Sequence, residues 1–63
     1  MDFVGALRLA IHKEEDSVRL YQVLGQGAEE PSVKKLFSVL IEQEQGHRMR
    51  LQDELDSVVL KDY

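Results

Sequence analysis

One short segment, GQGAEEP at residues 25–31, divides the sequence into two long stretches that contain no other proline. Its two glycines tolerate the left-handed conformation in which many helices end, and its proline suits the first turn of a new helix. The sequence therefore predicts a helix over about residues 2–24, a turn over 25–30 and a second helix over about 31–60. A connection this short predicts that the two helices fold back on each other as an antiparallel hairpin.

Apolar residues recur in both stretches at the intervals expected for a helix with one apolar face. The fold class predicted is all-α, with residues 1–63 as a single unit. A helical hairpin cannot cover one long apolar face by itself, whereas two copies related by a twofold axis can form a four-helix bundle. We therefore expect at least a homodimer. The apolar positions are Val4, Leu7, Ile11, Val18 and Tyr21 in the first stretch and Val33, Phe37, Leu40, Leu51, Leu55 and Val58 in the second.

Length and composition limit how such a chain can be stabilised. A chain of 63 residues buries little surface, and it has no cysteine, so disulfides and thiolate-bound metals are excluded. A bound metal or a partner chain remains. The net charge of −4, without a basic face, argues against nucleic acid as a partner. The apolar run near the N-terminus is too short to span a membrane, so we expect no membrane partner either.

Three polar residues occupy positions where the apolar pattern predicts core residues. Glu14 fills the gap in the first apolar series, and Glu44 and His47 fill the gap in the second. Residues three apart lie about 60° apart around a helix, so these side chains should converge inside the bundle. Isolated carboxylates in a core cost several kcal/mol unless they are paired, protonated or bound to a cation. The pattern therefore predicts a metal site, unless the Glu-x-x-His is only a surface pair on a helix that is rotated from this assignment.

A twofold dimer would combine four carboxylates and two imidazoles from Glu14, Glu44 and His47. That is the ligand set of di-iron carboxylate proteins, in which two helices supply a Glu each and two supply a Glu-x-x-His each. Four carboxylates also balance the charge of two divalent cations. Oxygen and imidazole ligands suit Fe(II) or Mn(II), while zinc would bind in vitro. We predict iron.

The same residues carry a resemblance to a known family. Tyr21 follows Glu14 by seven positions, and the Glu44-x-x-His47 motif is preceded by Lys34-Lys35-Leu36-Phe37. This pattern resembles the ferritin-like superfamily, closest to rubrerythrin-type and encapsulated-ferritin proteins built from a single hairpin. The resemblance implies a dimeric ferritin-like four-helix bundle, often within a larger ring, and a di-iron ferroxidase centre whose ligands are Glu14, Glu44 and His47 of both chains.

The resemblance also implies a function. It predicts an iron-binding protein that oxidises Fe(II) to Fe(III) for iron storage or detoxification, located in the cytoplasm or inside the shell of a protein nanocompartment. One alternative is a rubrerythrin-like peroxide reductase, which would need an external electron donor because the chain has no cysteine. A second alternative is a non-enzymatic dimerisation module with a polar, hydrogen-bonded core.

Three further residues have more than one interpretation. Tyr21 either donates a hydrogen bond or takes part in oxidation chemistry near the metal, or it is a core aromatic with its hydroxyl at the edge. Glu54, seven positions after the histidine of the Glu-x-x-His, is either an extra carboxylate for incoming iron or a surface charge paired with Arg50. His12 is offset by two positions from the first carboxylate, so it should lie on another face and be exposed.

Overall fold

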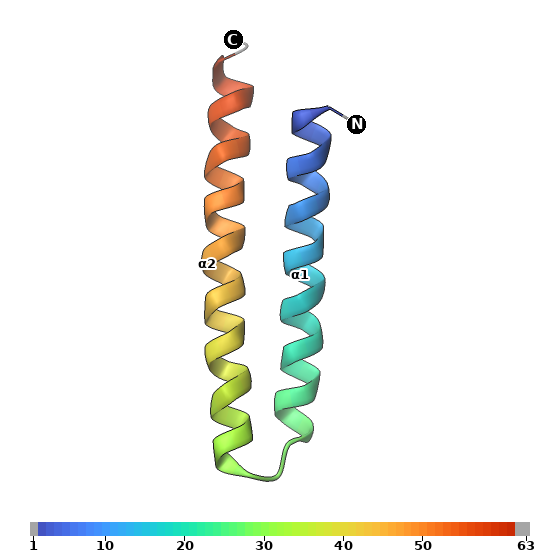
Figure 1. The fold of residues 1–63 in the computed structure, drawn as a ribbon, viewed down its shortest axis with the longest axis vertical. Coiled ribbons are helices and arrows are strands. Elements are labelled where there is room, and N and C mark those ends of the chain that lie inside the picture. The colour runs from blue at the N-terminus through green and yellow to red at the C-terminus, as the bar shows by residue number, and fades with distance from the viewer. Residues whose placement is uncertain (1, 62–63) are drawn as a thin grey trace.

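The computed structural model describes residues 2–61, which form two helices that lie side by side and antiparallel (Figure 1). They are α1 (Phe3–Gly27) and α2 (Pro31–Lys61). The described residues contain no strand, so the prediction of an all-α hairpin is confirmed. Residues 1, 62 and 63 of the predicted unit lie outside the described residues. Within the described part of the chain, neither helix is long and apolar enough to cross a membrane.

In both helices, amides of the first turn donate hydrogen bonds to the residue just before the helix. The Asp2 carboxylate accepts a hydrogen bond from the backbone amide of Gly5 at 2.6 Å, which is the usual role of an N-cap aspartate. At the start of α2, the Glu30 carbonyl accepts hydrogen bonds from the amides of Val33 and Lys34, both at 3.1 Å. The helix begins at Pro31, as predicted, because a proline in the first turn needs no amide partner.

The end of α1 differs from the prediction. The helix continues through both glycines to Gly27, and no described glycine has a positive φ, so the expected left-handed termination is wrong. Ala28 ends the helix instead in an extended conformation, and its amide donates to the Gly25 carbonyl at 3.4 Å. Gly25 has a packing role: a Cβ at this position would lie 3.2 Å from Cβ of Phe37. The glycine therefore lets the two helices approach closely beside the turn.

The two helical glycines should respond differently to alanine. Gly46→Ala is expected to raise the free energy of unfolding by about 1 kcal/mol, because alanine favours a helix and nothing lies within 4 Å of the added methyl group. Gly25→Ala should fall short of that gain by about 1 kcal/mol or more, because Phe37 must move. Urea unfolding of both variants at one protein concentration measures the difference. Equal gains would contradict the close contact at position 25.

The core of a single hairpin is small. Only Leu7, Ile11 and Leu55 are buried among the described residues, all toward the end of the hairpin that carries the termini. Near the turn, the rings of Tyr21 and Phe37 pack at a tilt, with their centroids 6.0 Å apart. The half-buried residues packed against the core are Val4, Leu51 and Val59.

Much apolar surface stays uncovered. The chain exposes 4993 Å², whereas a compact monomer of 7.3 kDa is expected to expose about 4200 Å². The excess of about 800 Å² matches what one protein usually buries in a stable interface. The hairpin is also only 11 Å thick in its shortest dimension, which is the diameter of one helix. The large exposed apolar residues are Phe3, Leu9, Leu20, Val23, Leu24, Leu36, Val39, Met49 and Leu60.

Candidate metal centre

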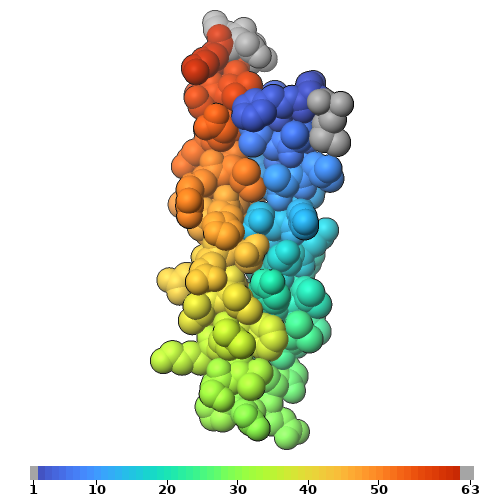
Figure 2. Space-filling view, viewed as in Figure 1, coloured from blue at the N-terminus to red at the C-terminus, as the bar shows by residue number. Residues whose placement is uncertain are grey.

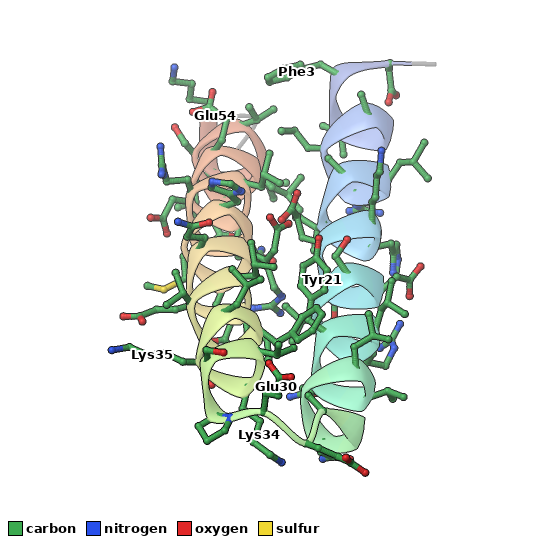
Figure 3. The ribbon with its side chains drawn as sticks, turned by 60° about the horizontal axis from the view of Figure 1, so that its bottom comes forward. Phe3, Tyr21, Glu30, Lys34, Lys35 and Glu54 are labelled. Atoms are coloured by element: carbon green, nitrogen blue, oxygen red, sulfur yellow. The ribbon has the colours of Figure 1, made fainter. Side chains whose placement is uncertain are left out.

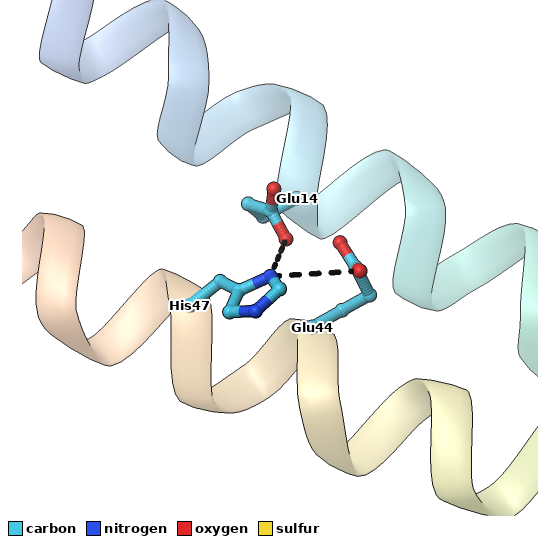
Figure 4. A group of neighbouring side chains, drawn as sticks. All are labelled: Glu14, Glu44 and His47. Carbon is cyan, nitrogen blue, oxygen red and sulfur yellow. Dashed lines mark ion pairs between the residues drawn. The ribbon is translucent and has the colours of Figure 1, made fainter.

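Three polar side chains meet between the helices at the middle of the hairpin (Figure 4). Glu14 of α1 and Glu44 and His47 of α2 each offer one ligand atom, and these atoms lie within 4.8 Å of one another. Nδ1 of His47 is 3.7 Å from Oε2 of Glu14 and 3.6 Å from Oε1 of Glu44. These separations are longer than hydrogen bonds. The structure therefore brings together all three residues that interrupt the apolar series, in an arrangement that fits a bound cation.

The two helices shield the three side chains unequally. Each carboxylate side chain is 20% exposed, whereas the His47 imidazole is 49% exposed. The carboxylates occupy the helix faces that continue the apolar series, so Glu44 does not belong to a rotated surface pair. The imidazole lies at the edge of the cluster, on one open side of the hairpin. A single chain therefore shields the carboxylates but leaves the site open at the imidazole.

The electrostatics of the cluster centre on Glu14. The pKa of its carboxyl is raised, chiefly by a hydrogen bond with the Glu44 carboxyl, which can form only while one of the two carries a proton. Burial and the negative charge of Glu44 raise this pKa further, while the charges of His47 and Lys13 oppose the rise. By geometry, Oε2 of Glu14 is buried and accepts no hydrogen bond. Once ionised, this oxygen needs a cation.

Metal-free protein is expected to lose stability as the pH rises above 4.5, the ordinary value for the Glu14 carboxyl, and through its raised pKa. The folded protein holds this proton more tightly than the unfolded chain, so the contribution is complete at low pH and is lost above the folded-state pKa. Glu14→Gln stays neutral and should flatten this part of the profile. Melting temperatures of chelator-treated protein across the pH range measure the effect. If the melting temperature of Glu14→Gln fell with pH as steeply as that of the unmodified protein, Glu14 would not be the source of the effect.

A cavity of about 400 Å³ adjoins the cluster on the His47 side. Besides Glu14 and His47, it is lined by Ala10, Arg50 and Leu51. The seam between the helices is visible along one face of the hairpin in Figure 2. These three residues were not assigned to the site from the sequence, although their spacing gives a signal. Ala10 precedes Glu14 by four positions, and the other two follow His47 by three and four, so all lie one helical turn from a ligand.

The remaining predicted residues lie outside the cluster. Tyr21 lies between the helices, where it packs on Phe37, as expected for a core aromatic (Figure 3). Glu54 is exposed nearer the carboxyl end of α2, and among the described residues it forms no ion pair with Arg50. The His12 side chain is 77% exposed, as predicted, with its Nδ1 3.9 Å from Oε1 of Glu15.

Comparison with protein families identifies what this hairpin is similar to. Residues 5–62 match the family model described as Rubrerythrin, which is nearly the whole chain. Comparisons with curated proteins and with solved structures gave no match. A match of this extent, over both helices and all three residues of the cluster, confirms the ferritin-like resemblance and supports iron binding and redox activity at the coarse level of the family. The chain belongs to the rubrerythrin family.

Proposed function

We propose that two copies of this protein assemble a di-iron carboxylate site, and that the site oxidises Fe(II) to Fe(III) for iron storage or detoxification. The ligands are Glu14, Glu44 and His47 of each chain. One observation carries the proposal: Oε2 of Glu14 is buried without a hydrogen-bond partner inside a group of three ligand atoms within 4.8 Å of one another. A divalent cation would give this oxygen a partner and would relieve the repulsion between the two carboxylates.

The donor set fits iron. Two carboxylates and one imidazole, with no thiolate, are ligands typical of Fe(II) or Mn(II) sites, and zinc would bind in vitro. Bound iron would supply the redox chemistry: two Fe(II) ions give the two electrons that, with two protons, reduce O2 to H2O2 or H2O2 to water. The chain's own residues supply negative charge and position. Glu14 and Glu44 neutralise the cations, and His47 completes the set from the open side of the hairpin.

A second copy is the best candidate to close the site. We call the side of the hairpin that carries the imidazole the His47 face. Helical periodicity puts apolar residues of both helices on this face, and several of them are among the large exposed apolar side chains. An excess surface of about 800 Å² per chain suits a stable dimer. The His47 face comprises Ala6, Ala10, Ser17, Leu20 and Leu24 of α1 and Leu36, Leu40, Gln43, His47 and Arg50 of α2.

Tyr21 has a subsidiary place in this proposal. It follows Glu14 by two helical turns on the same face of α1, and it is half-buried against Phe37. Its hydroxyl could donate a hydrogen bond to a metal-bound Glu14 carboxylate. A phenol can also give up an electron during oxidation. Tyr21→Phe should therefore slow Fe(II) oxidation without preventing iron binding.

Anaerobic native mass spectrometry with increasing Fe(II) tests the stoichiometry. We expect two irons per two chains, because each chain provides half of the ligand set. Glu44→Ala should lose the iron. A dimer that never takes up iron would contradict the proposal and would favour the non-enzymatic alternative, in which the polar cluster only stabilises the fold. A metal-bound monomer would show that the second copy is not needed.

A rubrerythrin-like peroxide reductase is the second candidate, and the family match favours it. The chain has no cysteine to hold a rubredoxin-type iron, so electrons would have to come from an external donor. The two functions differ in what they consume. A peroxide reductase turns over H2O2 continuously with a reducing partner and accumulates no ferric product, whereas a ferroxidase consumes Fe(II) and accumulates Fe(III).

A further inference from the structure

A second cavity lies on the side of the hairpin opposite the His47 face. It has a volume of about 440 Å³ and lies between the two helices. We call it the outer pocket. One half of the pocket is apolar and is formed by Val18 and Met49. The other half is formed by polar and charged side chains of the same two helices. The outer pocket is lined by Glu15, Val18 and Arg19 of α1 and by Gln45, Arg48 and Met49 of α2.

The outer pocket and the metal cluster lie at the same level of the hairpin, on opposite sides of the seam between the helices. Glu15, Gln45 and Arg48 each directly follow one of the three cluster residues in the sequence. Successive residues of a helix are turned by about 100°, so each of these side chains points to the far side of the seam from its neighbour. A second copy seated on the His47 face would leave the outer pocket open to solvent.

Arg48 has hydrogen-bonding capacity to spare. Its side chain is 42% exposed, so more than half of it is shielded by the hairpin. Its one ion pair is with Glu15, with 4.0 Å between Nε and Oε2, and among residues 2–61 its guanidinium donates no hydrogen bond. A guanidinium has five N–H donors in a planar fork that matches carboxylate and phosphate oxygens. Arg48 therefore has a donor group facing the pocket without a close acceptor.

The neighbouring charges permit an anion to enter. Arg19 supplies a second guanidinium, which is paired outside the pocket with Asp16. Glu15 is the one carboxylate of the lining, and it has another partner available, because His12 Nδ1 lies 3.9 Å from its Oε1. An incoming oxyanion can thus replace Glu15 beside Arg48, and Glu15 can turn toward His12.

We propose that the outer pocket binds a small organic anion: a carboxylate- or phosphate-bearing molecule with an apolar body. The oxyanion pairs with the guanidinium of Arg48 and with that of Arg19, which gives up its hydrogen bond to Asp16, and the apolar body contacts Val18 and Met49. This site is separate from the metal cluster and does not depend on the proposed oxidation of iron.

Titrations of chelator-treated, isotope-labelled protein, followed by amide chemical shifts in NMR spectra, test the proposal. Four probes separate the two halves of the site: phenyl phosphate, benzoate, inorganic phosphate and benzyl alcohol. We expect phenyl phosphate or benzoate to bind with a dissociation constant of roughly 1 mM, which is typical for a ligand of this size. The largest shifts should lie at residues 15–19 and 45–49. Inorganic phosphate has no apolar body and benzyl alcohol has no anionic group, so each should bind about tenfold more weakly or not at all.

Two variants and a matched control make the test specific. Arg48→Gln and Arg19→Gln should each weaken binding by about tenfold or more, because each removes a charge-assisted hydrogen bond. Arg8→Gln is the control, since Arg8 is an exposed arginine of α1 that does not line the pocket, and it should leave binding unchanged. The amide spectrum of each variant verifies its fold.

The proposal is overturned if neither phenyl phosphate nor benzoate shifts the pocket amides at roughly 20 mM, or if both arginine variants bind like the control. Preference between phenyl phosphate and benzoate identifies the headgroup. Because the protein is metal-free throughout, these outcomes are independent of whether the cluster binds iron.

Discussion

Fe(II) oxidation is expected to fall to the protein-free rate when Glu44 is replaced by alanine, a loss of about 100-fold or more. The substitution removes one of the two shielded carboxylates and leaves His47 and Glu14 without the third ligand atom of the cluster. Alanine is a good helix former, so α2 should persist. Stopped-flow absorbance of the ferric product after mixing with aerobic Fe(II) measures the rate.

A matched control separates ligand loss from general damage. Glu42→Ala removes a carboxylate from the same helix, two positions away and on its exposed side, and should oxidise Fe(II) like the unmodified protein. Oxidation that survives in both Glu44→Ala and His47→Ala would mean that the three-residue cluster is not the site. Equal losses in Glu42→Ala and Glu44→Ala would point to electrostatic attraction of iron by the whole helix.

Divalent metal is expected to raise the melting temperature at pH 7 by roughly 10 °C or more over chelator-treated protein. Metal at about 100 times its dissociation constant stabilises a folded state by about 2.7 kcal/mol, which is a large shift for so small a protein. The physical source is Glu14, whose carboxyl has a raised pKa because its ionised form is disfavoured beside Glu44 unless a cation is bound. Mn(II) is the convenient probe because air does not oxidise it rapidly.

The cluster should be the source of this shift. Glu14→Gln removes one charged ligand and should reduce the metal-induced shift to a few degrees, while Glu42→Gln should keep it whole. If Mn(II) left the melting temperature of the unmodified protein unchanged, the polar cluster would be a structural core and the proposed function would fail.

The hairpin could be predicted because local signals decide it. One Gly- and Pro-containing break and two apolar series of helical period specify two helices and their antiparallel course. The end of α1 could not be predicted, because a glycine is equally consistent with a helix that ends in the left-handed conformation and with a close contact between two helices. At Gly25 the glycine is explained by the close contact with Phe37. That contact depends on how two segments far apart in the sequence pack together.

The cluster was predictable for a related reason. Helical period fixes which face a residue occupies, so polar residues that interrupt the apolar series of two facing helices must meet. The rotation of each helix about its own axis determines which of the three side chains is most exposed. It also determines which carboxylate oxygen lacks a hydrogen-bond partner. The same rotation determines the outer pocket. Glu15, Gln45 and Arg48 carry no sequence signal of a pocket, because charged and amide side chains are common on exposed helix faces.

The three-residue core has a consequence for how the protein behaves on dilution. Among the described residues of one hairpin only Leu7, Ile11 and Leu55 are buried, so in the proposed dimer the folded state would draw stability from chain association as well as from chain folding. If two chains complete each metal centre, as proposed, the number of complete centres grows with the square of chain concentration when chains are scarce. A cell that makes few copies would hold separate halves, and one that makes many would hold working sites, so expression level alone could switch the activity on.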